Sequence, residues 1–237
     1  MNLFNEEEYI REKYAEYLNE DYVNLYEEID ALEKLLEAET EINSKEVENS
    51  GSSYKEGAES TAPAGHQWVY VFIVNAKEIT TKVIRHFTKQ PYNHSAISFD
   101  KSLTNMASFV APSFKRESIK TYKPEATFSL YKIAVPNDAV IVMKDAISNI
   151  EQTKKDYKYS ILGLLGFIDK RHARLYNSRK NAMFCSQFVA KMFATAGMKI
   201  FGDRPDYTIK PYDFAKNKNF KFCYRGNVKN YNPAKVR

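Results

Sequence analysis

The run WVYVFIV at residues 68–74 constrains the fold more than any other feature of the sequence. It holds seven consecutive β-branched or aromatic residues, and such a run is typical of a strand that is buried on both faces of a sheet. A strand of this kind needs other strands beside it and further elements over both faces. The 237 residues of the chain are enough to supply them within one core of ordinary size.

The segments after this strand alternate between two hydrophobic periods. Strand-like segments lie at 94–99, 103–110, 126–135 and 220–226. Apolar residues at helical spacing lie at 77–89, 139–156 and 183–197, a short helix begins at 210, and the apolar residues 159–167 fit either a helix or a buried loop. Asp100 and Lys101 are expected to form a tight turn between two of the strands. The mixed order predicts an α+β domain with an antiparallel sheet and packed helices.

Charge is divided unevenly along the chain. Residues 1–60 contain 18 of the 30 acidic side chains but only 5 of the 35 basic ones, so the net charge is −13 there and +18 in the rest. An acidic segment followed by a basic one predicts two modules. We therefore expect an acidic amphipathic helix at 1–42, a flexible linker rich in Gly, Ser and Ala at 43–65, and the main domain at 66–237.

The N-terminal segment has the apolar spacing of one helix face. No Pro or Gly interrupts residues 4–39, and apolar residues recur at steps of four and three, at Leu18, Tyr22, Leu25, Ile29, Leu32 and Leu36. Two interpretations stay open. The helix either pairs with a second copy of itself as a short coiled coil, which would make the protein a homo-oligomer, or it folds back onto the main domain.

Composition excludes several classes of protein and site. Two cysteines are too few for a disulfide-dense secreted scaffold or a four-thiolate zinc site, and we expect no metal and no cofactor. No uncharged apolar run of about 18 residues is present, so no transmembrane segment is expected. The acidic N-terminus lacks the pattern of a secretory signal, which favours a cytoplasmic protein, although virion-associated or other delivery is also compatible.

The basic main domain suits an anionic partner, such as a wall polymer or a membrane surface. Its last segment, residues 216–237, mixes Lys and Arg with aromatic residues, as single-strand binders do. A solvated basic surface is the simpler interpretation of such a tail, so no nucleic acid partner is expected.

Cys185 is the strongest candidate for a nucleophile. It lies at or just before the first turn of the helix expected at 183–197, and a helix N-terminus presents free N–H groups and a partial positive charge. Both favour the thiolate, and the N–H of Cys185 would point to where an oxyanion forms in acyl transfer. A free cysteine among apolar neighbours is more often a small buried side chain, and we interpret Cys223, in the last strand, in that way.

A thiol nucleophile needs a nearby base, which is usually a histidine. His94 begins an expected strand directly after a turn, and a strand end is a rigid platform for a positioned base. The other histidines lie at the linker edge, within an expected helix and in a charged segment, at His66, His86 and His172. The strand after His94 offers Asn105 and Ser108 as polar groups that would orient the imidazole, and alternation alone leaves open which of the two faces it.

Several motifs, in this order, resemble those of the permuted papain-like amidases and peptidases, a branch of the NlpC-type superfamily that includes YiiX-like and lecithin-retinol acyltransferase-like proteins. VYVFIV leads into KVIRHFTKQPYNHSAISFD, which is similar to the family's strand, helix and Asn-His-x-Ser-x-x-x-Asp. LTNMASF is like its Leu-x-x-x-x-Ser-Phe strand, FCSQFVAKMFATAG is like its Cys-Ser-x-Phe-Val helix, and IKPYDFA is like its Thr-Pro-x-Asp segment. The resemblance covers residues 68–226 and implies a circularly permuted papain-like fold, which the N-terminal helix precedes.

The resemblance implies that Cys185 is the nucleophile and His94 the general base. Cys185 would attack an amide or ester carbonyl and form a thioester, which is then released to water or another acceptor. Some members of the family orient the histidine with a Glu or a second His on the next strand, where this sequence has only Asn105 and Ser108. We therefore expect a neutral orienting residue, which stabilises an imidazolium less well than a charged one.

Four further residues are expected to bind substrate in the cleft: Tyr92 and Asn93, just before His94, and Ser186 and Gln187, at the start of the helix. The first interpretation of function is a cysteine-dependent hydrolase (an amidase or peptidase) or acyltransferase, which acts on an amide or ester such as a peptidoglycan peptide or a lipid. The alternative is a non-catalytic binding or assembly module that keeps the fold.

Overall fold

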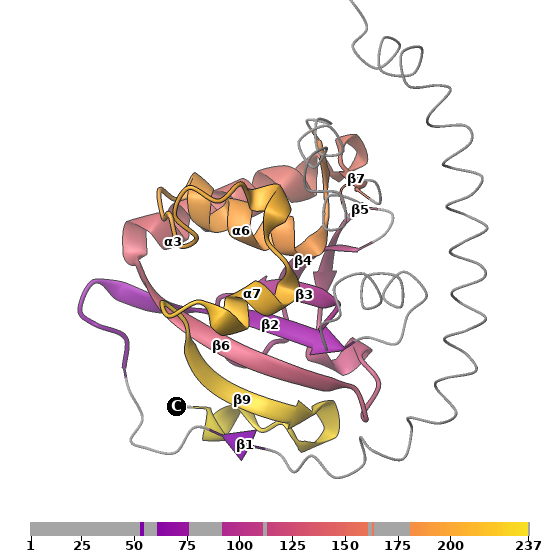
Figure 1. The fold of residues 1–237 in the computed structure, drawn as a ribbon, viewed down its shortest axis with the longest axis vertical. Coiled ribbons are helices and arrows are strands. Elements are labelled where there is room, and N and C mark those ends of the chain that lie inside the picture. The colour runs from indigo at the N-terminus through magenta and orange to yellow at the C-terminus, as the bar shows by residue number, and fades with distance from the viewer. Residues whose placement is uncertain are drawn as a thin grey trace, which may run out of the picture. The chain divides into compact units, whose positions relative to one another are not determined.

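The computed structural model describes residues 53–54, 61–75, 92–110, 113–160, 163 and 181–236, all within one compact unit at 50–237. The helices expected at 1–42 and 77–89 lie outside the described residues, as does most of 159–167. Within the described residues, strands and helices come in mixed order around an antiparallel sheet, so the α+β class is confirmed (Figure 1).

Seven strands form the main sheet, in the order β1-β9-β6-β2-β3-β4-β5, and every neighbouring pair is antiparallel. Their bounds are β1 Ser53–Tyr54, β2 His66–Asn75, β3 His94–Ser98, β4 Met106–Val110, β5 Ser113–Glu117, β6 Thr127–Pro136 and β9 Lys221–Asn227. A small parallel sheet pairs β7 (Lys158–Tyr159) with β8 (Ala182–Met183).

Three α-helices are described in full, namely α3 Asn137–Gln152, α6 Cys185–Thr195 and α7 Pro211–Lys216. Short 3-10 turns lie at Ile119–Thr121, Lys154–Asp156, Asp206–Thr208, Val228–Asn230 and Pro233–Lys235. The three helices lie over one face of the sheet (Figure 1). Segments between strands and the C-terminal residues cover part of the other face.

The central strand β2 is buried on both faces, as its uncharged run predicts. Between Val69 and Val74 the odd-numbered side chains join an apolar cluster with α3, α6 and α7, and the even-numbered ones join a second cluster on the opposite face. Burial of this kind stabilises by about 1.5–3 kcal/mol for each large apolar side chain. β3 lies beside β2 and pairs with it through His94 opposite Val74, so the sheet centre fixes the start of β3.

Helix α6 begins at Cys185 because Phe184 before it is extended and Met183 belongs to β8. Its apolar side chains are buried on the sheet, and the ring of Phe188 lies 5.2 Å from that of Phe109 of β4. The helix ends before Gly197, whose φ of 75° is in the left-handed region that glycine adopts readily. The contact between Phe188 and Phe109 lies one turn after Cys185, so packing of α6 against β4 fixes the position of the helix N-terminus.

Some boundaries differ from those expected. The strand expected from residue 103 begins at Met106, because Leu103 has a φ of 56° and interrupts an extended backbone. Helix α3 ends at Gln152, and residues 154–156 form a 3-10 turn in place of the last helical turn expected. Within the expected linker, Ser53–Tyr54 pairs with β9.

Strand β5 was not expected at all. Its sequence, SFKRE, contains one apolar residue, Phe114, and three charged ones, which is typical of a sheet edge and gives almost no hydrophobic signal. The described part of the chain contains no helix with the length and hydropathy that crossing a membrane requires.

Candidate active site

Cys185 is the first residue of α6. Phe184, the residue before the helix, makes no side-chain hydrogen bond to the first-turn N–H groups. These N–H groups therefore lie beside the sulfur with the partial positive charge of the helix end. The cysteine is 1% exposed and forms no disulfide.

His94 begins β3 and is 8% exposed. Its Nε2 lies 2.8 Å from Oε2 of Glu117, which ends β5 at the edge of the sheet. The other oxygen, Oε1, accepts a hydrogen bond of 3.1 Å from the hydroxyl of Tyr122. A carboxylate bound to one ring nitrogen fixes the imidazole in orientation and leaves Nδ1 as the nitrogen for the thiol.

The imidazole of His94 is held in its protonated form. Burial lowers its pKa, but the charge of Glu117 and hydrogen bonds with Cys185 and Glu117 outweigh burial, and the pKa of His94 is raised to about 10. For Glu117, burial raises the pKa, while the charge of His94 and its hydrogen bond lower it further than burial raises it. The pKa of Glu117 is therefore lowered overall, and the two side chains form a buried ion pair.

The thiol of Cys185 responds to the same pair. Burial raises its pKa, but the hydrogen bond with His94 and the positive charge of His94 outweigh burial, and the backbone of Ser95 adds to them. The pKa of Cys185 is lowered as a result. A depressed thiol pKa beside a raised imidazole pKa favours a thiolate–imidazolium pair, which is the reactive state of a nucleophilic cysteine.

Tyr159 adds a hydroxyl to this pair. Burial raises the pKa of Tyr159, and the negative charge of Cys185 and a hydrogen bond with its sulfur raise it further. The phenol therefore stays protonated beside the sulfur. Tyr159 reaches the site because β7 pairs with β8, which leads through Phe184 into the helix of Cys185.

The structure corrects the expected orienting residue. Asn105 is exposed, in the turn before β4, and Ser108 donates a hydrogen bond of 2.7 Å to the carbonyl of Ser95. Neither makes the contact with His94 that Glu117 makes. The sheet order explains why: β5 lies one strand beyond the strand considered, and its Glu117 is opposite Met106 of β4. The group that contacts the His94 ring is thus the charged carboxylate of Glu117 and not the neutral side chain that was expected.

Tyr92 and Asn93 make contacts within the protein. The hydroxyl of Tyr92, which is 6% exposed, shares a hydrogen bond of 2.6 Å with Ser129, and its ring stacks on Tyr212. The amide nitrogen of the Asn93 side chain donates to Oδ1 of Asn75 at 3.4 Å. These contacts hold the two residues that precede His94, and a role for either residue in substrate binding stays a prediction.

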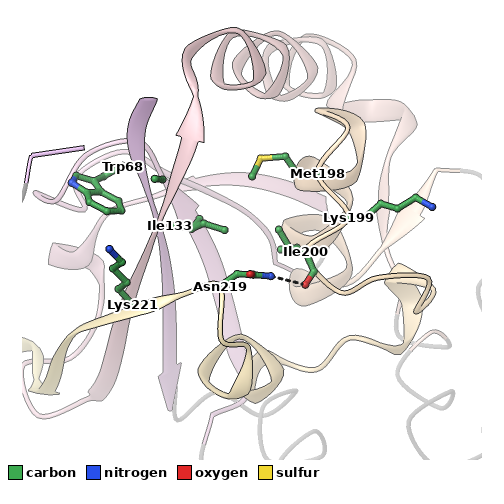
Figure 2. Close-up of a pocket in the computed structure, with 8 residues that line it drawn as sticks. Trp68, Ile133, Met198, Lys199, Ile200, Asn219 and Lys221 are labelled. Atoms are coloured by element: carbon green, nitrogen blue, oxygen red, sulfur yellow. Dashed lines mark hydrogen bonds between the residues drawn. The ribbon is translucent and has the colours of Figure 1, made fainter. Parts of the chain in front are cut away.

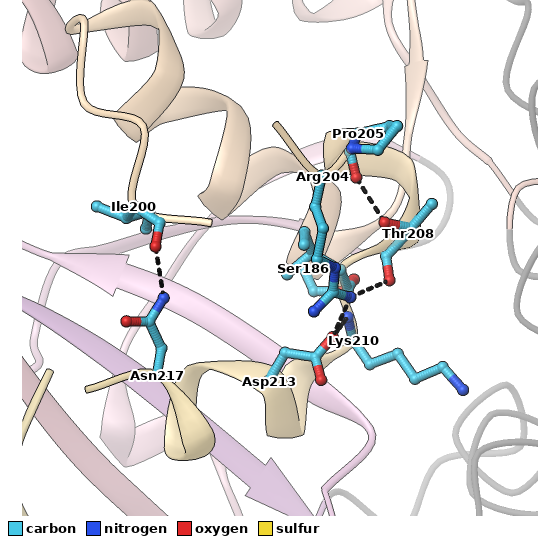
Figure 3. A network of polar contacts seen from close by, with 9 residues as sticks. Ser186, Ile200, Arg204, Pro205, Thr208, Lys210, Asp213 and Asn217 are labelled. Carbon is cyan, nitrogen blue, oxygen red and sulfur yellow. Dashed lines mark hydrogen bonds and ion pairs between the residues drawn. The ribbon is translucent and has the colours of Figure 1, made fainter. Parts of the chain in front are cut away.

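Ser186 anchors the first turn of α6. Its hydroxyl donates a hydrogen bond of 2.6 Å to the carbonyl of Ile209. Figure 3 shows the surrounding network, in which Arg204 donates to the carbonyl of Thr208 at 3.0 Å and pairs with Asp213 at 2.8 Å. The network holds residues 204–213 against the start of the helix, so Ser186 positions the neighbouring Cys185.

Gln187 is 6% exposed, and its Nε2 lies 3.5 Å from Oδ1 of Asp206. Its Oε1 is buried and has no hydrogen-bond partner. Of the expected substrate-binding residues, Gln187 thus keeps an unused acceptor beside the first turn of α6.

The remaining histidine and cysteine candidates lie elsewhere. His66 bonds through Nδ1 to the carbonyl of Ala64 at 3.0 Å, while His86 and His172 lie outside the described residues. Cys223 is buried in β9 within the second apolar cluster, as a packing side chain would be. In the described ranges no group of three or more His, Cys, Asp or Glu side chains has the arrangement of a metal site.

Comparison with known proteins identifies no family model that matches the chain and no matching curated protein.

Proposed function

We propose that the protein is a cysteine-dependent hydrolase, an amidase or peptidase, in which Cys185 is the nucleophile, His94 the acid and base, and Glu117 the orienting residue. The observation that carries this proposal is the buried His94–Glu117 pair, whose imidazole also interacts with the thiol of Cys185. Three groups in this order match the roles of nucleophile, base and orienting group.

The proposed reaction begins with attack of the Cys185 thiolate on an amide or ester carbonyl carbon, which forms a carbon–sulfur bond. The N–H of Cys185 at the helix end and the hydroxyl of Tyr159 are the donors proposed for the oxyanion. His94 then gives its proton to the leaving nitrogen or oxygen as the bond to carbon breaks. This leaves a thioester on Cys185 and a neutral imidazole.

Water completes the cycle. The neutral His94 takes a proton from water as its oxygen attacks the thioester carbon, and the carbon–sulfur bond breaks to release an acid and the thiolate. The carboxylate of Glu117 stabilises the imidazolium that forms again. An alcohol or amine in place of water would give acyl transfer by the same steps.

For the fold, we propose a circularly permuted papain-like domain of the NlpC type. His94 on a strand precedes Cys185 at a helix N-terminus in the chain, and the sheet between them is antiparallel, which supports this assignment. Peptidoglycan peptides and lipid acyl groups are the substrate classes that the resemblance favours. The high burial of Cys185 favours a second candidate, a binding module that keeps the fold without catalysis.

Trapping of the acyl-enzyme tests the proposal. A Cys223→Ser protein is mixed with p-nitrophenyl acetate or with p-nitrophenyl octanoate and quenched in acid. Mass spectrometry then gives the mass of the intact protein and of its peptides after digestion. We expect one acyl group on Cys185, which hydroxylamine removes as it would a thioester. Cys185→Ala in the same background is the control and should carry none.

Failure to acylate would decide between the two candidates when it is combined with alkylation. If iodoacetamide labels Cys185 in the folded protein but neither ester acylates it, the hydrolase proposal is wrong. If neither reagent reaches Cys185 until the protein is unfolded, the binding module is the better account.

A further inference from the structure

A pocket of about 450 Å³ lies where β9 begins, and none of Cys185, His94 and Glu117 lines it (Figure 2). Its volume is within the range of pockets that hold small organic molecules. Apolar side chains of β6 and of the segment after α6 form one part of the wall, among them Ile133, Met198 and Ile200. The aromatic ring of Trp68 and the side chain of Lys221 lie across from them (Figure 2).

Two lysines lie against the ring of Trp68. The Nζ atoms of Lys132 and Lys221 are 4.2 Å and 5.3 Å from the ring centroid. These two lysines are also directly opposite each other on β6 and β9. Both ammonium groups therefore lie within cation–π distance of the same ring, which places positive charge beside the pocket.

The charges at the pocket point to the same kind of ligand. No Asp or Glu lines the pocket, and Lys221 is exposed and forms no ion pair with a carboxylate of the described residues. Lys199, also in the lining, pairs with Asp203 at 3.0 Å, but both side chains are more than three-quarters exposed, so this pair is weak. The pocket therefore offers cationic groups at an apolar surface.

We propose that this pocket binds a small organic anion with an apolar body, such as an alkyl carboxylate. The charged head would lie beside Lys221, and the apolar body would pack against Trp68, Ile133 and Met198. The site is distinct from the proposed catalytic residues, so the inference does not depend on the hydrolase activity.

Trp68 makes the test specific, because it is the single tryptophan of the chain. Octanoate, octanol and octylammonium are titrated into the full-length protein while Trp68 emission is followed. We expect octanoate to change the emission saturably and octanol to bind about twofold to fivefold more weakly, because a charge pair with an exposed lysine is worth little. Octylammonium should bind more weakly still, since Lys221 repels its charge.

Variants locate the binding. Lys221→Gln should weaken octanoate binding by about twofold to fivefold, since it removes an exposed charge beside the ring. Lys218→Gln is the matched control, because Lys218 is an exposed neighbour that does not line the pocket, and Cys185→Ala should also leave the affinity unchanged.

Any of four results would overturn the proposal. The first three are equal affinity for octanoate and octylammonium, equal loss of affinity in the Lys221→Gln and Lys218→Gln proteins, and a loss of affinity in Cys185→Ala. The fourth is a change of Trp68 emission with anionic lipid vesicles but none with monomeric octanoate, which would identify a membrane surface as the ligand. Circular dichroism of each variant verifies that it is folded, so a loss of binding is assigned to the side chain.

Discussion

Glu117→Gln is expected to return Cys185 to the thiol form at neutral pH and to lower its reactivity by about tenfold to a hundredfold. The carboxylate of Glu117 raises the pKa of His94, and the charge of His94 lowers the pKa of Cys185. Without the carboxylate, burial lowers the pKa of the imidazole, and the thiolate loses its cationic partner. A free thiol with a pKa of about 8.5 is only about 1% thiolate at pH 6.5.

The measurement is the rate of Cys185 alkylation by iodoacetamide at that pH, in a Cys223→Ser background. Glu151→Gln is the matched control. It makes the same chemical change in a carboxylate that pairs with Arg116 at 2.7 Å, but there the side chains are 41% and 32% exposed. We expect the control to react as the parent protein does. Equal rates for all three proteins would show that Glu117 has no influence on the thiol.

Phe188→Ala is expected to destabilise the protein by about 3–5 kcal/mol. The ring is fully buried under α6, 5.2 Å from the ring of Phe109 and 5.8 Å from that of Phe114. Removal of the ring leaves a cavity between α6 and β4, so the start of α6 loses packing contacts with the sheet. The free energy of unfolding, measured in urea, reports the loss.

The control for this change is Ile141→Ala on α3, whose side chain is 59% exposed and which should alter stability by no more than about 0.5 kcal/mol. The two substitutions remove apolar atoms of a similar kind in buried and exposed settings. A cost below about 1 kcal/mol for Phe188→Ala would contradict the packing of α6 on β4.

The positions of strands and helices could be predicted from the sequence where the hydrophobic pattern is strong. The uncharged run of β2 requires burial on both faces, and the apolar spacing of α6 specifies the face that packs on β4. The pair of Cys185 and His94 came from a helix N-terminus and a strand start together with the resemblance, and the structure brings these two side chains together.

Glu117 could not be predicted in the same way. Its strand has one apolar residue, so no period distinguishes β5 from a surface loop, and the search for an orienting group ended at the adjacent strand. The signal that was available is weaker: Phe114 and Arg116 alternate with Lys115 and Glu117, as the residues of an edge strand do. Which acid reaches His94 depends on sheet order and register, and both are set by tertiary packing.

The most direct test of the central claim, that Cys185 and His94 form an ion pair in the folded protein, is a pH titration of the thiolate by its ultraviolet absorbance. It needs no reagent to reach the buried sulfur. The Cys223→Ser protein is compared with the same protein carrying Cys185→Ala between about pH 5 and pH 9. The difference removes the absorbance of the tyrosines, which with their usual pKa of about 10 begin to ionise at the upper end of this range. We predict a thiolate signal that is already present at pH 7 and that titrates below the ordinary thiol pKa of about 8.5. A midpoint at or above that of the unfolded chain would contradict the account.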